Sequence, residues 1–143
     1  MIQVSMVPKE LIHTCWGTVG PFLDRAARYT YGRYTVEDIH TAIVDYEHDL
    51  WVAFEGSEIK GAVVTNFMNY PKRKVLSMTF CGGVELSKWK DPMLDLLRRY
   101  AKDMGCDGIE ATARRGWAKI FQNDGHKSLW ATFELPLEGV NHG

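Results

Sequence analysis

The sequence predicts an α/β fold in which one mixed β-sheet carries helices on its faces. Three apolar segments rich in Val, Thr and Phe are separated by turn residues, which is typical of an antiparallel meander: residues 50–55, 59–68 and 75–81. A helical pattern follows the third segment, and a fourth apolar segment, residues 109–113, comes after it. A strand–helix–strand unit of this kind favours a right-handed crossover between two parallel strands. The sheet is therefore predicted to contain both antiparallel and parallel pairs.

The composition is that of an ordinary globular protein. The chain has 143 residues, of which 45% are hydrophobic and 24% are charged. A chain of this length buries about two-thirds of the surface that its unfolded form exposes, so it requires neither a metal nor a disulfide to stabilise a core. We therefore expect one domain that spans residues 1–143.

The charge balance disfavours two classes of binding protein. Lys and Arg number 17 against 18 for Asp and Glu, which gives a net charge of −1. A dedicated nucleic-acid binder or anionic-membrane binder is usually basic, so we expect neither partner. No apolar run approaches the roughly 18 residues that a membrane span needs, and the N-terminal residues do not resemble a signal peptide. Both observations favour a cytoplasmic location.

The cysteine and histidine patterns indicate neither a disulfide nor a metal site. Cys15, Cys81 and Cys106 lie far apart and form no CxxC pair, which is typical of reduced thiols in a reducing compartment. The five histidines show no paired spacing on one strand or helix, so we expect no metal.

The N-terminal third is predicted to form a short strand and two helical regions. Residues 2–7 alternate weakly, and the apolar positions of residues 9–31 step by three or four. Pro21 and two nearby glycines interrupt this pattern, which predicts a kinked helix or two short ones. Thr35 is a good N-cap for the next helix, with Glu37 and Asp38 near its positive end. The apolar face of that helix comprises Val36, Ile39, Ile43 and Tyr46.

The clearest helix of the sequence spans residues 92–104. Asp91 is placed as its N-cap, Pro92 occupies the first helical position, and Gly105 follows where a left-handed residue often ends a helix. The predicted buried stripe consists of Leu94, Leu97, Ala101 and Met104. The opposite, polar side carries Asp95, Arg98, Arg99 and Lys102.

The C-terminal part is predicted to add a helix and a last strand. After the strand at residues 109–113, residues 116–123 read as a short helix and residues 128–137 as a strand. In that last strand Leu129, Ala131, Phe133 and Leu135 alternate with the other side chains. The sequence therefore predicts a single domain with a mixed sheet, whose strands and helices follow the order β-α-α-β-β-β-α-β-α-β along the chain.

This order resembles the GNAT superfamily of acetyl-CoA-dependent N-acetyltransferases over nearly the whole chain. The resemblance is carried by three stretches: LWVAFEGSEIKGAVVTNFMNYPKRKVLSMTFCGG, MLDLLRRYAKDMGCDGIEATARR and GWAKIFQNDGH. More narrowly, the chain is similar to short GNAT-like proteins encoded by tailed bacteriophages, on the stretches GRYTVEDI, LWVAF, GCD and RRGW. The resemblance implies an α/β acetyltransferase fold that binds acetyl-CoA.

The resemblance also implies where the cofactor would bind. The family holds the pyrophosphate in an Arg/Gln-x-x-Gly-x-Gly/Ala loop, because backbone amides cradle phosphate only where no Cβ blocks the approach. Lys88 falls at the basic position of this loop, but Trp89 and Asp91 stand where small residues are expected. We therefore expect that residues 84–91 do not form a tight phosphate-cradling turn. The cofactor-binding positions implied by the resemblance are Phe80, Cys81, Gly82, Gly83, Lys88 and Arg114.

The catalytic residues stay unassigned at this stage. Members of the family often use a tyrosine of the last helix as general acid, and Phe121 stands at that position here. The third meander strand offers no carboxylate, and Glu85, just beyond its end, is the nearest one and the candidate for a general base. Acetyl transfer to an amine can also proceed through water-relayed proton transfer.

Two functions from different classes follow from the resemblance. The first is transfer of an acetyl group from acetyl-CoA to the amine of a small molecule or a protein. The second is a catalytically degenerate GNAT fold that serves a phage as a virion or assembly component, or that binds a host protein. The absent loop glycines and Phe121 favour the second function. A phage-encoded protein would act in the host cytoplasm or in the virion.

Overall fold

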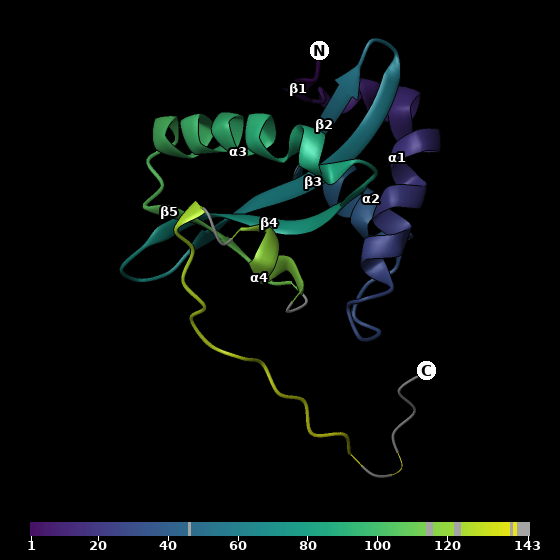
Figure 1. The fold of residues 1–143 in the computed structure, drawn as a ribbon. Coiled ribbons are helices and arrows are strands. Elements are labelled where there is room, and N and C mark those ends of the chain that lie inside the picture. The colour runs from purple at the N-terminus through teal and green to yellow at the C-terminus, as the bar shows by residue number, and fades with distance from the viewer. Residues whose placement is uncertain (46, 114–115, 122–123, 138, 140–143) are drawn as a thin grey trace. The chain divides into compact units, whose positions relative to one another are not determined.

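The computed structural model describes residues 1–45, 47–113, 116–121, 124–137 and 139. Its contacts divide the chain into two units, Met1–Thr112 and Ala113–Gly143. The first unit is an α/β structure that contains all strands of the described residues and three of the helices (Figure 1). The second unit contains one short helix.

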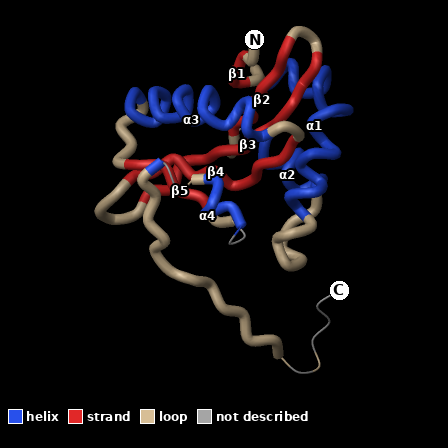
Figure 2. Tube along the Cα trace, in the orientation of Figure 1, coloured by secondary structure: helices blue, strands red, loops and turns tan. Residues whose placement is uncertain are grey.

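The first unit is built on a mixed five-stranded sheet. Its strands are β1 (Gln3–Met6), β2 (Asp49–Glu55), β3 (Glu58–Asn69), β4 (Lys74–Gly83) and β5 (Gly108–Ala111), in the spatial order β1-β2-β3-β4-β5. The first four strands pair antiparallel, whereas β4 and β5 are parallel and are joined by a helix (Figure 2). The predicted meander and the predicted parallel pair are both confirmed.

Helices cover both faces of this sheet. Two helices, α1 (Ile12–Ala27) and α2 (Val36–Val44), lie on one face, and α3 (Leu86–Asp103) lies on the other (Figure 1). A 3₁₀ turn at Lys9–Leu11 precedes α1. α1 continues through Pro21 as one helix, so of the two predicted arrangements the pair of short helices is wrong. Burial of the side chains on either side of Pro21 offsets the hydrogen bond that a proline removes. Among the described residues, no helix combines the length and the apolar character needed to cross a bilayer.

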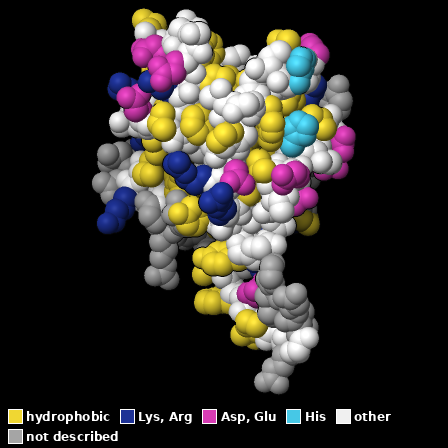
Figure 3. Space-filling model, turned by 90° about the vertical axis from the view of Figure 1, so that its right-hand side faces the viewer, with side chains coloured by type: hydrophobic (Ala, Val, Ile, Leu, Met, Phe, Trp, Pro, Cys, Tyr) yellow, Lys and Arg dark blue, Asp and Glu magenta, His cyan; other side chains and the backbone are white. Residues whose placement is uncertain are grey.

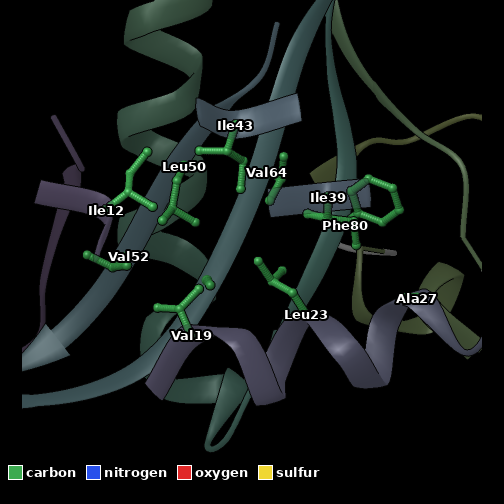
Figure 4. Packing of buried hydrophobic residues seen from close by; sticks show 11 residues of the cluster. Ile12, Val19, Leu23, Ala27, Ile39, Ile43, Leu50, Val52, Val64 and Phe80 are labelled. Atoms are coloured by element: carbon green, nitrogen blue, oxygen red, sulfur yellow. The ribbon is translucent and has the colours of Figure 1, made fainter. Parts of the chain in front are cut away.

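The core lies between the sheet and the two helices α1 and α2. Figure 4 shows side chains of both helices pointing toward those of the strands. The fully buried members of this cluster include Val19 and Leu23 of α1, Ile39 and Ile43 of α2, and Leu50 and Val64 of the sheet. Burial of one such side chain contributes about 1.5–3 kcal/mol, so this cluster determines how α1 and α2 sit on the sheet.

Thr35 is the N-cap of α2, as the sequence predicts, and the structure adds a capping box with Asp38. The Asp38 amide donates a hydrogen bond of 3.2 Å to the Thr35 hydroxyl, and the Thr35 amide donates one of 2.9 Å to the Asp38 carboxylate. These bonds satisfy two backbone donors that a helix start would otherwise leave without partners. Of the predicted apolar face, Ile39 and Ile43 are buried, while Tyr46 lies outside the described residues.

The predicted start of α3 is wrong, because the helix begins at Leu86 and Pro92 is its seventh residue. Trp89 and Met93 are buried and extend the apolar stripe toward the N-terminus, so packing extends the helix before Pro92. The predicted stripe is confirmed for Leu94, Leu97 and Ala101. Met104 is 43% exposed, because the helix ends just before it and its side chain leaves the buried face.

The second unit contains α4 (Gly116–Ile120) and, among its described residues, the segment 126–137, which forms neither helix nor strand. The predicted order of elements is confirmed as far as α4. The exception is the last strand, since residues 126–137 pair with no described strand. A strand exists only where a neighbour accepts its backbone hydrogen bonds, and an alternating pattern by itself provides no such neighbour.

Replacing Leu97 by alanine tests the packing of α3 on the sheet. Leu97 is fully buried, so Leu97→Ala is expected to lower the free energy of unfolding by about 2–5 kcal/mol, as core truncations do. Met104→Ala, at the residue that follows the last residue of α3, is the control and should cost less than about 0.5 kcal/mol, because that side chain is exposed. Urea denaturation followed by circular dichroism measures both. Equal losses would contradict the assigned orientation of α3.

Candidate functional site

The centre of the candidate site is the half of β4 that β5 does not accompany. β4 spans ten residues, but β5 pairs with it only along Val75–Met78. Residues 79–83 therefore have β3 as their one paired neighbour among the described residues. A strand with a single neighbour presents unpaired backbone donors and acceptors at its other edge, where an extended ligand can bind.

A β-bulge lies in β4 immediately after Met78, the last residue of β4 that pairs with β5. The register of β3 and β4 passes from Val64 opposite Phe80 to Thr65 opposite Met78, so that Thr79 faces no residue of β3. The Thr79 hydroxyl donates a hydrogen bond of 3.0 Å to the Val64 carbonyl and holds the bulge. A bulge bends its strand and increases the local twist, which turns this half of β4 away from β5. No sequence signal marks this bulge.

Phe80 and Cys81 contribute to the free half of β4 through their backbone. The Phe80 side chain is buried in the α1/α2 core, where its ring meets that of Tyr34 edge-on at 5.2 Å. Burial raises the pKa of the Cys81 thiol to about 12. The thiolate is the nucleophilic form of cysteine, so this environment disfavours a nucleophilic role for Cys81 at neutral pH.

Gly82 and Gly83 permit close packing within the protein. A Cβ atom on Gly82 would lie 2.4 Å from the Phe22 carbonyl oxygen of α1. One on Gly83, whose φ is +147°, would lie 2.4 Å from the Lys60 carbonyl oxygen of β3. Both positions therefore require glycine, because a side chain there would collide with neighbouring backbone. The sequence alone did not indicate this packing role.

The connection from β4 to α3 consists of Val84 and Glu85 alone. Glu85 is the N-cap of α3 and has a left-handed backbone with φ of +54°. Residues 86–91 form the first turns of the helix, and the buried Trp89 indole donates a hydrogen bond of 2.9 Å to the Val84 carbonyl. Most of the stretch that was compared with a phosphate loop is thus helical.

A cluster of charges surrounds the start of α3. The Lys60 ammonium lies 2.7 Å from Glu85 and 3.3 Å from Glu58, and the Lys88 ammonium lies 3.4 Å from the other oxygen of Glu85. The Lys60 side chain is only 10% exposed. Hydrogen bonds from Lys60 and Lys88 lower the pKa of Glu85, and the bond to Glu85 raises the pKa of Lys60. Glu85 is thereby held as a paired carboxylate, which disfavours it as a general base near neutral pH.

Lys60 was not among the predicted site residues. The available signal was a lysine inside the otherwise apolar run from Ile59 to Val64, where a charged side chain needs a partner. Its partner Glu85 is 25 residues away in the sequence. The structure brings together Phe80, Cys81, Gly82, Gly83, Glu85 and Lys88 along the end of β4 and the start of α3.

The remaining two predicted positions belong to the second unit. Arg114 lies outside the described residues. The Phe121 ring stacks on Trp117 with a centroid distance of 6.1 Å, and the Nδ1 atom of His126 lies 3.0 Å from the Phe121 carbonyl oxygen. Phe121 carries no hydroxyl and so supplies no proton. Within the described ranges, no three His, Cys, Asp or Glu side chains are grouped as a metal site would need.

The Lys60–Glu85 pair predicts a pH-dependent effect of Glu85→Gln. Because the folded state lowers the pKa of Glu85, its contribution to stability is present above the unfolded pKa and is lost as the pH falls through the folded one. Glu85→Gln should therefore destabilise the protein at pH 7 and have little effect in strong acid. Urea denaturation at a series of pH values, from pH 7 down to strong acid, measures the difference in unfolding free energy between the variant and the wild type. Asp95→Asn, in an exposed pair with Arg98, is the control and should cost less stability at pH 7 than Glu85→Gln does.

Gly82→Ala tests the contact between β4 and α1. The added methyl group collides with the Phe22 carbonyl, so α1 must shift, and we expect a loss of about 1–3 kcal/mol of stability. Gly17→Ala is the control, because a Cβ there meets nothing within 4 Å and a glycine inside a helix is unfavourable by about 0.5–1 kcal/mol. The control should be stabilising. If Gly82→Ala leaves the free energy of unfolding unchanged in denaturation experiments, the backbone of β4 is not in tight contact with α1 at this position.

Comparison with known proteins supports the fold. No family model matches the sequence, and no curated protein matches it. Among solved structures, a GNAT family acetyltransferase of Staphylococcus aureus matches with a TM-score of 0.66 and 11% identity, over 95% of this chain and 98% of that one. A predicted acetyltransferase with acetyl-CoA from Clostridium acetobutylicum matches with a TM-score of 0.66 and 14% identity, over 95% and 96%.

A third solved structure resembles the chain equally well. It is an aminoglycoside acetyltransferase from an uncultured soil metagenomic sample, in complex with sisomicin, with a TM-score of 0.69 and 8% identity over 96% of this chain and 97% of that one. At such low identities the likeness establishes the fold alone. The chain therefore has the α/β fold of the GNAT acetyltransferases.

Proposed function

We propose that this protein is an acetyl-CoA-dependent N-acetyltransferase. The observation that carries the proposal is the free half of β4, residues 79–83, which leaves β5 at the Thr79 bulge. The pantetheine arm of coenzyme A contains two amide groups and can pair with a strand edge as a peptide does. The fold shared with acetyltransferases, one of them with acetyl-CoA, supports the same ligand.

The residues around this edge differ in how well they suit the two ends of the cofactor. The backbone of residues 79–83 suits the amide-containing arm, since its second edge is unpaired among the described residues. For the phosphates, the sequence offers cations in place of a glycine loop: Lys88, Lys90 and Arg114. Of these, Lys88 is 56% exposed, whereas Lys90 is 19% exposed and lies 3.4 Å from Asp91. Arg114 lies outside the described residues. Contacts of an exposed cation such as Lys88 with phosphate weaken as salt increases, so we expect weak and salt-dependent binding.

The chemistry that acetyl-CoA supplies is an activated acetyl thioester. The chain itself would hold that thioester against the end of β4 and orient the incoming amine, and positioning of this kind contributes strongly to rate. The Glu85 carboxylate is engaged by Lys60 and Lys88, so we assign proton removal from the amine to solvent water. The acceptor class that we propose is a primary amine, and the sisomicin complex of one structural neighbour supports a small molecule.

A second function, a GNAT fold kept as a binding module, is favoured by specific features. The β4–α3 connection has only two residues, and both of its neighbouring glycines are used for internal packing. Phe121 replaces the tyrosine that the family often uses as general acid. Such a protein would bind a phage or host protein, in line with the resemblance to short phage-encoded proteins.

Binding of acetyl-CoA distinguishes the two functions. A ligand at about a hundred times its dissociation constant stabilises the native state by roughly 2.7 kcal/mol, so millimolar acetyl-CoA should raise the melting temperature of an acetyltransferase. Calorimetric titration at low and moderate salt should show weaker binding at moderate salt and for Lys88→Ala. Lys102→Ala, an exposed cation at the far end of α3, is the control and should bind as wild type does.

Two outcomes would contradict the expected result. The absence of any thermal shift with millimolar acetyl-CoA would exclude the acetyltransferase and leave the binding module. Tight binding that depends on neither salt nor Lys88 would instead show that backbone groups hold the phosphates. Where binding is observed, release of free coenzyme A on addition of sisomicin or a lysine-containing peptide measures the acetyl transfer itself.

A further inference from the structure

The first strand of the sheet lies at an edge. Among the described strands β1 pairs with β2 alone, and its residues Gln3–Met6 include neither a charge nor a proline, which commonly protect such edges. The Val7 amide donates a hydrogen bond of 2.8 Å to the Leu50 carbonyl, so Val7 faces β2. Successive residues of an antiparallel pair direct their backbone groups alternately toward the partner strand and away from it. Val4 and Met6 therefore direct their N–H and C=O groups to the edge.

An apolar groove runs beside this edge, within the first unit. It has a volume of about 460 Å³, and its apolar lining comes from β1, β2 and α3: Val4, Met6, Trp51, Leu96 and Tyr100. The Trp51 indole N–H donates a hydrogen bond of 2.8 Å to the Thr65 hydroxyl, so the indole presents carbon surface to the groove. The Tyr100 ring packs edge-on against it at 4.9 Å. A side chain that enters the groove therefore meets aromatic and aliphatic carbon.

Two charged side chains of α3, Arg99 and Asp103, also line the groove. Within the described ranges neither of them forms a hydrogen bond or an ion pair. Three ion pairs engage other charged side chains at this helix: Lys88 with Glu85, Lys90 with Asp91 and Arg98 with Asp95. Figure 3 shows a similar arrangement on one face of the molecule, where basic and acidic side chains lie next to one another. Arg99 and Asp103 are thus available to charges of opposite sign on a ligand.

The spacing of these two charges matches an extended peptide. Four residues of an α-helix span about 6 Å along its axis, and this separates Arg99 from Asp103. Alternate side chains of a strand point to the same face and are about 6.6 Å apart. Two alternate residues of a bound strand, one acidic and one basic, therefore reach the two charges. Leu96 lies nearly one turn before Arg99, so the next alternate residue at that end meets the apolar part of the groove.

We propose that the edge of β1 and the groove beside α3 bind an extended segment of another protein. The segment adds as a strand through backbone hydrogen bonds to Val4 and Met6, which is a recurring mode of peptide recognition. Its side chains that face the groove are apolar, acidic and basic at successive alternate positions, and they meet Leu96, Arg99 and Asp103. Two strands separate β1 from β4, so this surface is distinct from the candidate site and does not depend on the proposed function.

Defined peptides test this proposal on the full chain. The probes are two fluorescent nine-residue peptides with leucine, glutamate and lysine at alternate positions and threonine elsewhere, one in each order. Both orders are needed because a strand adds to an edge in either direction. Fluorescence anisotropy should show that one of them binds the wild-type protein with a dissociation constant below about 1 mM. The same peptide with glutamate and lysine exchanged should bind at least about tenfold more weakly, because each charge then faces its like.

Variants test the backbone and the charge contacts separately. Val4→Pro removes an N–H that points away from β2, so it should weaken binding at least about tenfold, whereas Val4→Thr keeps that N–H and should bind as wild type does. Arg99→Glu should weaken binding to a similar degree, and a peptide with lysine in place of glutamate should bind this variant more tightly than it binds the wild type. Arg98→Glu is the matched control, because it makes the same change of charge at a residue that does not line the groove. Circular dichroism establishes that each variant is folded.

Three results would overturn the proposal. The first is the absence of binding by both peptides at several hundred micromolar protein, which would include the case in which the chain itself fills the groove. The second is binding that survives Val4→Pro or Arg99→Glu, since the peptide would then bind without the edge or without the charge. The third is a wild-type dimer in sedimentation velocity that Val4→Pro dissociates, because the edge would then be occupied by a second copy of the chain.

Discussion

The structure depends above all on the backbone hydrogen bonding of β4. This strand pairs with β3 from Lys74 to Gly83, except at the bulged Thr79, but with β5 only along Val75–Met78. The first half is thereby fixed inside the sheet, while the second half keeps a free edge. The Thr79 bulge lies where the two halves meet, and its hydroxyl is bonded to the Val64 carbonyl. The position of the candidate site follows from this difference between the two halves of one strand.

Packing of α3 on β3 determines what surrounds that free edge. The Trp89 ring lies so close to the backbone of Gly61 that a Cβ there would be 2.3 Å from it. The same indole is bonded to the Val84 carbonyl, so the helix begins immediately after β4. This shortens the connection and places Glu85 against Lys60. The Lys60–Glu85 ion pair therefore occupies the N-terminus of α3, where the positive end of the helix dipole could otherwise bind an anion.

Local patterns were sufficient for much of the fold. Alternation and turn residues predicted the meander, the Thr35 cap predicted the start of α2, and strand–helix–strand order predicted the parallel pair. Each of these depends on residues that are near in sequence, so the chain itself carries the information. The start of α3 was predicted wrongly because Pro92 is a strong local signal and the burial of Trp89 is a tertiary one. For the site, the sequence pointed to the end of β4 and the residues after it, and that assignment stays a prediction.

The sequence by itself determined the order of elements, the apolar faces and the residue types at the end of β4. Only the tertiary structure decided the Thr79 bulge, the Lys60–Glu85 pair and the roles of the glycines, because each joins backbone or charges from different strands and helices. The same limit applies to residues 128–137. Alternation makes this segment able to form a strand, but a strand forms only where another edge accepts its hydrogen bonds, and a linear pattern does not specify that edge.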